Sequence, residues 1–141
     1  MTDRDYMLMA IGAAQTSNDP SSNKKVGSII VKNGEVVGSG NRQVYIFKVS
    51  PYKDICIHAE HIALMEAGIM AKRSTVYCTM EPCTNRHIGD ENGILPPKSC
   101  CDLLIDAGVD RVCYLSSDNY IGGGGEKKLL DAGIKVEKFI I

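Results

Sequence analysis

The sequence predicts an α/β fold, a three-layer α/β/α sandwich around a five-stranded mixed sheet with parallel strands 4 and 5. An Asn-Gly pair joins two short β-branched segments, as is typical of an antiparallel hairpin. Strand-like and helix-like segments then alternate along the rest of the chain, which favours parallel strands joined by right-handed crossovers. A length of 141 residues is enough for one compact core, so we expect a single domain spanning residues 1–141.

The first half of the chain is expected to contain two helices and the hairpin. Apolar residues recur at helical spacing over residues 3–16, and a polar segment with Pro20 ends that pattern. The hairpin strands are residues 26–31 and 35–39. A second helical stripe covers residues 58–70.

The second half is expected to alternate strands and helices. In chain order these are a strand at 74–79, a helix that ends at Ala107 before Gly108, a strand at 109–115, a helix at 126–132 and a strand at 134–141. The segment 80–98, between the first of these strands and the helix, has no clear periodicity. It is therefore expected to be an irregular loop.

Composition and charge restrict the class of partner. The 16 Lys and Arg residues nearly balance the 17 Asp and Glu residues, so bulk charge gives no broad attraction to nucleic acid or anionic lipid. This favours a small-molecule partner. No apolar stretch reaches the roughly 18 residues of a membrane span, and the N-terminus lacks signal-peptide features. We therefore expect a cytoplasmic protein with no membrane association.

Six cysteines in a chain without an export signal are expected to be reduced, either as metal ligands or as small core residues. Three lie in or beside apolar stretches, where a free thiol packs like a small hydrophobic group: Cys56, Cys78 and Cys113. The other three lie among Pro, Asn, Gly and Lys, and they are the candidates for chemistry: Cys83, Cys100 and Cys101.

Three segments bring together residues that suit a catalytic metal. His58 opens a helix, Cys83 follows the next strand, and Cys100 opens the helix after it. One imidazole and two thiolates suit Zn²⁺, and three protein ligands leave a fourth position for water. Glu60, two residues beyond His58, is then placed to carry protons. The pattern predicts hydrolytic deamination, in which zinc-activated hydroxide attacks an amidine-like ring carbon and ammonia leaves.

The chain resembles the zinc-dependent cytidine and deoxycytidylate deaminase superfamily, in which His-Ala-Glu is followed by Pro-Cys and a further Cys. Within it, the chain is most similar to the pyrimidine deaminase domain of the riboflavin pathway, on five segments: SNKKVG (22–27), TMEPC (79–83), LPP (95–97), DLLIDAGV (102–109) and DAGI (131–134). The resemblance implies a cytidine-deaminase-type sandwich with a parallel fifth strand. It also implies one deaminase domain, a pyrimidine substrate and a homo-oligomer.

The chain departs from that family in the spacing of its second pair of ligands. Sixteen residues lie between Cys83 and Cys100, where relatives have a much shorter segment. The register with Gly108 favours Cys100 as the ligand, and Cys101 or His87 remains an alternative. Arg42 and Asn85 also stand where riboflavin-type relatives carry histidines, so the substrate is left open between a riboflavin-precursor-like and a dCMP-like molecule.

Three residues are candidates for substrate contact. Asn23 matches an asparagine of the riboflavin-type pattern and would bind a base edge or a ribose hydroxyl, although asparagine is equally common in turns. Asn41 lies one residue from the position where relatives often carry asparagine after the hairpin. Ala59 lies between His58 and Glu60.

Two further functions compete with a small-molecule deaminase. In a structural zinc module used for binding, Cys101 or His87 would complete four protein ligands. A tRNA or single-stranded DNA editing deaminase would instead need a basic groove with aromatic side chains. The chain has no Trp and two Phe, which makes the nucleic-acid substrate the less favoured one.

Overall fold

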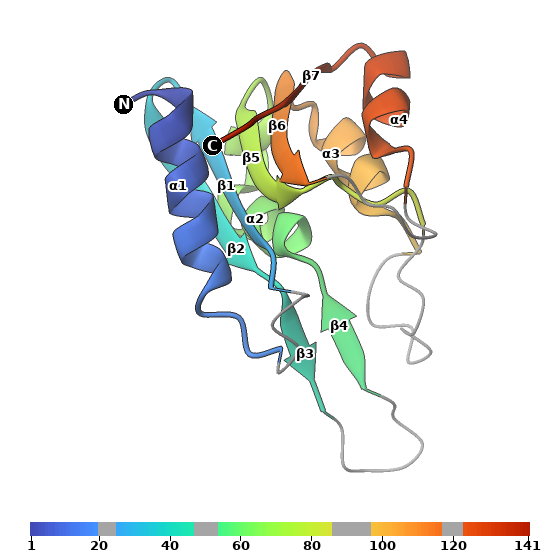
Figure 1. Cartoon of the computed structure of the whole chain (residues 1–141). Coiled ribbons are helices and arrows are strands. Elements are labelled where there is room, and N and C mark those ends of the chain that lie inside the picture. The colour runs from blue at the N-terminus through green and yellow to red at the C-terminus, as the bar shows by residue number, and fades with distance from the viewer. Residues whose placement is uncertain (20–24, 47–53, 86–96, 117–122) are drawn as a thin grey trace.

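A mixed sheet of five strands forms the middle of the structure, a computed structural model that describes residues 1–19, 25–46, 54–85, 97–116 and 123–141. Its strands are β1 (Gly27–Lys32), β2 (Glu35–Asn41), β5 (Thr75–Met80), β6 (Arg111–Ser116) and β7 (Lys135–Lys138). Their order is β2-β1-β5-β6-β7 (Figure 1). β1 is antiparallel to both β2 and β5, whereas β5, β6 and β7 are parallel. The predicted hairpin and parallel strands are confirmed.

Helices cover both faces of the sheet. They are α1 (Asp3–Ala14), α2 (Ala59–Ala67), α3 (Cys100–Ala107) and α4 (Gly125–Asp131). Alternate strand residues enter separate apolar clusters because successive side chains of a strand point to opposite faces. Ile29 belongs to the cluster that contains Met7 of α1, and the next residue, Ile30, belongs to the cluster that contains Ala63 of α2 and Leu104 of α3. α1 therefore forms one outer layer and α2, α3 and α4 the other, as the three-layer prediction requires (Figure 1).

Glycines of β2 bring the start of α2 into direct contact with the sheet. A Cβ atom on Gly40 would lie 2.4 Å from the carbonyl oxygen of Ala59, and one on Gly38 would lie 2.3 Å from that of Ala63. Side chains at these two positions would push the helix away. Because glycine has no Cβ atom, these two residues let the start of α2 pack closely against the sheet.

Two helices begin with reciprocal capping boxes. In α3, Ser99 accepts a hydrogen bond from the backbone N–H of Asp102, and the Asp102 carboxylate accepts one from the N–H of Ser99. Thr2 and Asp5 form the same arrangement at the start of α1. Such boxes satisfy N–H groups that have no partner inside the helix, so they define the residue at which the helix begins. For α3 that residue is Cys100.

The structure also contains a second, two-stranded sheet that the sequence analysis missed. β3 (Gln43–Tyr45) pairs antiparallel with β4 (Ile55–Ile57), and this pair extends beyond the main sheet (Figure 1). Each strand has three residues, too few for an alternating pattern to stand out. The side chain of Asn18 supports β3, because it donates to the Val44 carbonyl at 2.9 Å and accepts from the Val44 N–H at 2.7 Å.

Several predicted boundaries were wrong by one to three residues. The helix predicted over 58–70 is α-helical only to Ala67, since Gly68 adopts a φ of 55° and a 3-10 turn (Gly68–Ala71) follows. The last strand ends at Lys138 and does not continue to Ile141. Cys56 is only partly buried, whereas Cys78 and Cys113 are fully buried as expected.

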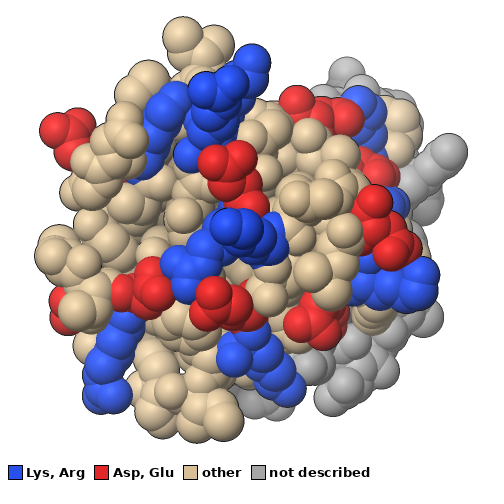
Figure 2. All heavy atoms as spheres, turned by 90° about the horizontal axis from the view of Figure 1, so that it is seen from above, with Lys and Arg blue, Asp and Glu red and all other residues tan. Residues whose placement is uncertain are grey.

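Basic and acidic side chains are interspersed on the face shown in Figure 2. Among the ion pairs of the described residues, Arg111 binds Asp3 at 2.8 Å and Glu137 at 3.0 Å. In the described part of the chain, no helix is long and apolar enough to cross a membrane.

Candidate metal centre

Three potential metal ligands come together at the ends of three elements. His58 is the N-cap residue of α2, Cys83 follows the end of β5, and Cys100 is the first residue of α3. In α/β sheets the carboxyl ends of parallel strands and the starts of neighbouring helices meet at one edge. The local sequence therefore places an imidazole and two thiols at that edge.

The distances between these ligand atoms suit a single metal ion. Nδ1 of His58 lies 3.3 Å from Sγ of Cys100 and 3.6 Å from Sγ of Cys83, and all three atoms lie within 4.8 Å of one another. Nitrogen and sulfur atoms bound to one tetrahedral zinc ion are about 3.5 Å apart, given ordinary zinc bond lengths. The residues therefore fit zinc both in chemistry and in spacing.

Hydrogen bonds around the cluster favour a thiolate at Cys83. Hydrogen bonds from the Cys100 thiol and from His58 lower the pKa of Cys83 to about 4, and the Cys100 N–H also donates to Cys83 Sγ at 3.4 Å. The same interaction, with burial, raises the pKa of Cys100 well above its ordinary value. Burial lowers the pKa of His58, but hydrogen bonding to Cys83 and the negative charges nearby outweigh it and leave that pKa raised.

Glu60 lies beside this cluster in the first turn of α2. Its side chain is buried, and burial raises the pKa of its carboxyl group, while the charge of His58 and a hydrogen bond with Cys100 oppose that shift. A raised carboxyl pKa suits a group that must both accept and donate a proton near neutral pH. The structure thus brings Glu60 together with the three potential ligands.

Cys101 belongs to a different set of contacts. Its thiol donates to the carbonyl oxygen of Pro82 at 3.3 Å, and its backbone N–H donates to the carbonyl oxygen of Cys83 at 3.1 Å. Within the described ranges, the cluster of potential ligands contains Cys100 and does not include Cys101. His87, the other alternative, lies outside the described residues.

The candidates for substrate contact are not all near the cluster. Ala59 lies between His58 and Glu60 and is fully buried against Gly40. The Asn41 amide binds the C-terminal end of α1, donating to the Ala13 carbonyl at 3.0 Å and to Thr16 Oγ1 at 2.7 Å. Asn41 thus joins β2 to α1. Asn23 lies outside the described residues.

One charged pair whose field reaches the centre is not evident from the sequence. Nε of Arg42 donates to Oδ2 of the buried Asp19 at 2.7 Å, and the positive charge of Arg42 acts to lower the pKa of His58. In the sequence, Arg42 stands out only because it replaces a histidine of the riboflavin-type pattern. Nothing in the sequence pairs it with Asp19, because the two residues lie 23 positions apart in different segments.

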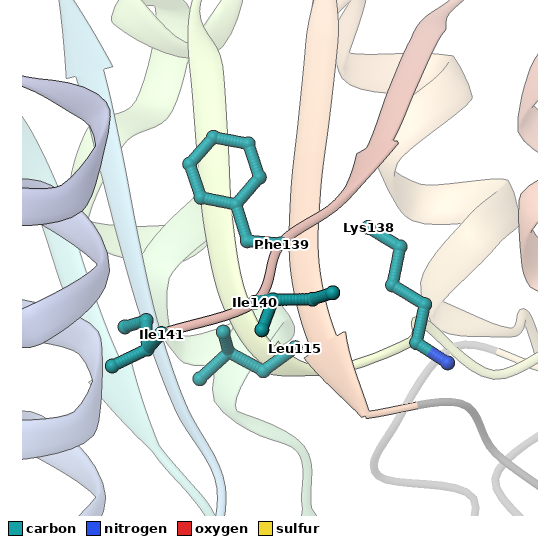
Figure 3. Close-up of a pocket in the computed structure, with 5 residues that line it drawn as sticks. All are labelled: Leu115, Lys138, Phe139, Ile140 and Ile141. Carbon is teal, nitrogen blue, oxygen red and sulfur yellow. The ribbon is translucent and has the colours of Figure 1, made fainter.

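A separate hollow lies at the C-terminal end of the chain. Figure 3 shows the residues that line it: Leu115, Lys138, Phe139, Ile140 and Ile141. None of these side chains is a metal ligand or a general base of the kind found at the cluster. Phe139 and Leu115 pack with the apolar cluster on the α1 side of the sheet, so this hollow is distinct from the metal centre.

The chain matches a known family over most of its length. Residues 1–116 match the family described as the cytidine and deoxycytidylate deaminase zinc-binding region. The riboflavin biosynthesis protein RibD of Escherichia coli (strain K12) is 40% identical over 139 residues, which cover 96% of this chain and 33% of that protein. The chain therefore spans about a third of the length of that relative.

Shorter relatives are matched over most of their length. The diaminohydroxyphosphoribosylamino-pyrimidine deaminase of Buchnera aphidicola subsp. Schizaphis graminum is 37% identical over 140 residues, covering 97% of this chain and 84% of that protein. The crystal structure of dCMP deaminase from the cyanophage S-TIM5 in apo form superposes with a TM-score of 0.70 at 27% identity. That match covers 99% of this chain and 100% of the phage chain.

Proposed function

The chain belongs to the cytidine and deoxycytidylate deaminase family, and from this premise we propose that it is a zinc-dependent hydrolase that releases ammonia from an aminopyrimidine. The observation that carries the proposal is the convergence of His58, Cys83 and Cys100, with the buried Glu60 beside them. In this proposal the three residues are the zinc ligands and Glu60 is the catalytic acid and base.

Zinc bound by these residues would lower the pKa of a water molecule to about 7 and make it a nucleophile at neutral pH. The protein's own contribution is proton transfer. Glu60 accepts a proton from the attacking water, gives it to the ring nitrogen next to the reacting carbon, and assists the departure of the amino group as ammonia. The carbon gains a C–O bond and loses a C–N bond, so one water is consumed for each ammonia released.

Burial and helix orientation prepare Glu60 and the thiols for this role. A carboxyl group that is buried resists ionisation, so it holds a proton more readily than an exposed one. The N-terminal ends of α2 and α3 carry His58 and Cys100, and helix N-termini favour negative charge. The helix ends therefore support thiolate ligands.

We propose a substrate of the riboflavin-precursor type, an aminopyrimidine that carries a phosphoribosylamino group. Support comes from the Buchnera relative, whose name specifies such a substrate and which is matched over nearly its whole length. A dCMP-like nucleotide is the second candidate, because the phage dCMP deaminase is matched from end to end at lower identity. A homo-oligomer in the cytoplasm remains part of the proposal.

The test is ammonia release and product mass with zinc-loaded protein. The panel comprises the riboflavin aminopyrimidine precursor, dCMP, deoxycytidine, cytidine and a tRNA anticodon hairpin. Glu60→Gln is the inactive control, and Glu66→Gln, an exposed glutamate on the same helix, is the matched control. We expect turnover of the riboflavin precursor by the wild type and by Glu66→Gln. Turnover of dCMP alone would replace the first substrate by the second, and absence of ammonia release from every member of the panel would contradict the proposed deaminase.

A further inference from the structure

The segment that carries Cys83 is fastened to the beginning of α4. Glu81, which is buried, precedes the ligand by two residues, and its Oε2 atom accepts a hydrogen bond from the backbone N–H of Glu126 at 2.8 Å. Gly124, the N-cap residue of α4, has no side chain with which to cap the helix. Glu81 thus caps the N-terminus of α4, although it lies in a distant segment of the chain.

Residues on both sides of Cys83 add to this attachment. A Cβ atom on Gly125 would lie only 2.0 Å from the carbonyl oxygen of Pro82, so the helix start and the ligand segment meet backbone to backbone. Immediately after Cys83, Thr84 Oγ1 donates to the carbonyl oxygen of Gly123 at 2.9 Å. The ligand is therefore held at the residues before it and after it.

α4 is also attached to the helix that carries the other thiol ligand. Nζ of Lys128 lies 2.8 Å from Oδ1 of Asp102 in the first turn of α3. The two helices lie side by side in Figure 1. The thiol of Cys101, which lies in α3, also donates a hydrogen bond to the carbonyl oxygen of Pro82, next to Cys83. One short helix thus contacts both of the segments that supply sulfur.

From these contacts we propose that Glu81 is a positioning residue for the metal centre, acting through α4. This inference rests on the proposed zinc site. The Glu81 carboxylate fixes α4 against the segment from Glu81 to Thr84, and α4 holds the distance between Cys83 and Cys100. Ligands fixed in advance bind zinc more tightly because less conformational freedom is lost on binding, and residues behind metal ligands commonly contribute in this way.

The test is the zinc affinity of the folded protein, measured by equilibrium competition with a colorimetric chelator. Glu81→Ala removes the acceptor, and we expect its zinc affinity to fall about 10–100-fold, the usual effect of losing such a support. Glu81→Gln keeps an oxygen that can accept from the Glu126 N–H, so its affinity is expected to stay close to that of the wild type. Glu66→Ala is the control for loss of an exposed glutamate.

The result distinguishes the positioning role of Glu81 from the existence of the zinc site itself. Equal zinc affinity in the wild type and Glu81→Ala would overturn the positioning role of Glu81 alone. Equal losses of zinc affinity in Glu81→Ala and Glu81→Gln would do the same. If the wild-type protein binds no zinc, both the proposed zinc site and the positioning role of Glu81 are refuted. Should Glu81→Ala fail to fold, Thr84→Val tests the same attachment: weaker zinc binding is expected, and unchanged affinity would refute it.

Discussion

Nδ1 of His58 and Sγ of Cys100 lie 3.3 Å apart, although 42 positions separate the two residues in sequence. Each residue sits where its helix begins, and α2 and α3 pack against one another on the same face of the sheet. The capping box of Ser99 and Asp102 determines where α3 starts, and the glycines of β2 determine how closely α2 approaches the sheet. The spacing of the ligands is therefore a consequence of how two helices begin.

Replacing the two adjacent cysteines of α3 should have opposite effects on whether the protein retains zinc. Cys100→Ala removes a proposed ligand, so we expect the purified protein to lose bound zinc. Cys101→Ala removes only the thiol that donates to the Pro82 carbonyl, and it should retain about one zinc ion per chain. Metal analysis of both variants, purified in parallel, measures this. Loss of zinc in Cys101→Ala together with its retention in Cys100→Ala would show that Cys101, and not Cys100, is the zinc ligand.

Replacing Glu60 should separate catalysis from metal binding. Glu60→Gln keeps the size of the buried side chain but cannot carry a proton, so deamination should fall by a factor of about 10²–10⁴, the usual contribution of a general acid and base. Zinc content should remain that of the wild type, since Glu60 is not a proposed ligand. Rates by ammonia release and zinc by metal analysis give the two readouts. Unimpaired turnover would show that another group transfers the proton.

A methyl group on Gly40 should disturb the fold at the point where α2 begins. Gly40→Ala would place its Cβ 2.4 Å from the Ala59 carbonyl oxygen and 2.7 Å from the Ala63 nitrogen, and both are backbone atoms that cannot move alone. We expect a loss of about 1–3 kcal/mol in the free energy of unfolding, as for other overpacked sites.

Gly12→Ala is the matched control for Gly40→Ala. Gly12 lies within α1, and a Cβ atom there has no neighbour within 4 Å. The replacement should therefore stabilise the protein by up to about 1 kcal/mol, because alanine favours the helix. Urea denaturation of both variants provides the comparison. Equal stability of Gly40→Ala and the wild type would contradict the tight contact between β2 and α2.

The ion pair between Asp3 and Arg111 should make stability depend on pH. Hydrogen bonds from Arg111 and Tyr77 lower the pKa of Asp3. A carboxyl group whose pKa is lower in the folded state stabilises the protein above its unfolded pKa of about 3.9, and this stabilisation is lost as the pH falls through the folded pKa. The pair is partly exposed, so the effect should be modest.

Asp3→Asn isolates this contribution. The asparagine still offers an oxygen to the Tyr77 hydroxyl but carries no charge. We expect the wild type to have the higher Tm at neutral pH, and the difference should shrink as the pH falls below about 4. Comparing the two proteins at each pH cancels the acid sensitivity of the thiol and imidazole groups. A difference that stays constant down to about pH 3 would show that Asp3 acts through its shape and not its charge.

Much of the fold was predictable because local signals agreed with one another. Asn33 and Gly34 adopt φ values of 52° and 78°, the left-handed conformation that an Asn-Gly hairpin turn needs. Gly108, with φ of 75°, ends α3 as predicted. These residues have a backbone conformation that few others adopt, so their effect can be recognised from sequence alone.

Features that depend on distant partners were not predictable. Asn41 was a candidate for substrate contact, but its amide binds the end of α1, and no local pattern shows that α1 ends beside it. Glu81 was visible only as part of a Glu-Pro-Cys segment. Its partner, the Glu126 N–H, lies 45 positions away and is brought close only when the start of α4 packs against α3 and against the segment that follows β5. The roles of both side chains are set by tertiary packing.

The most direct test of the proposed zinc centre is X-ray absorption spectroscopy at the zinc edge of the purified, zinc-loaded wild-type protein. We expect a four-coordinate ion with two sulfur ligands at about 2.3 Å, and nitrogen or oxygen in the other two positions. That environment matches Cys83, Cys100, His58 and one position left for water. Three sulfur ligands would place Cys101 on the metal and convert the centre into a closed structural site, contradicting the proposed catalysis.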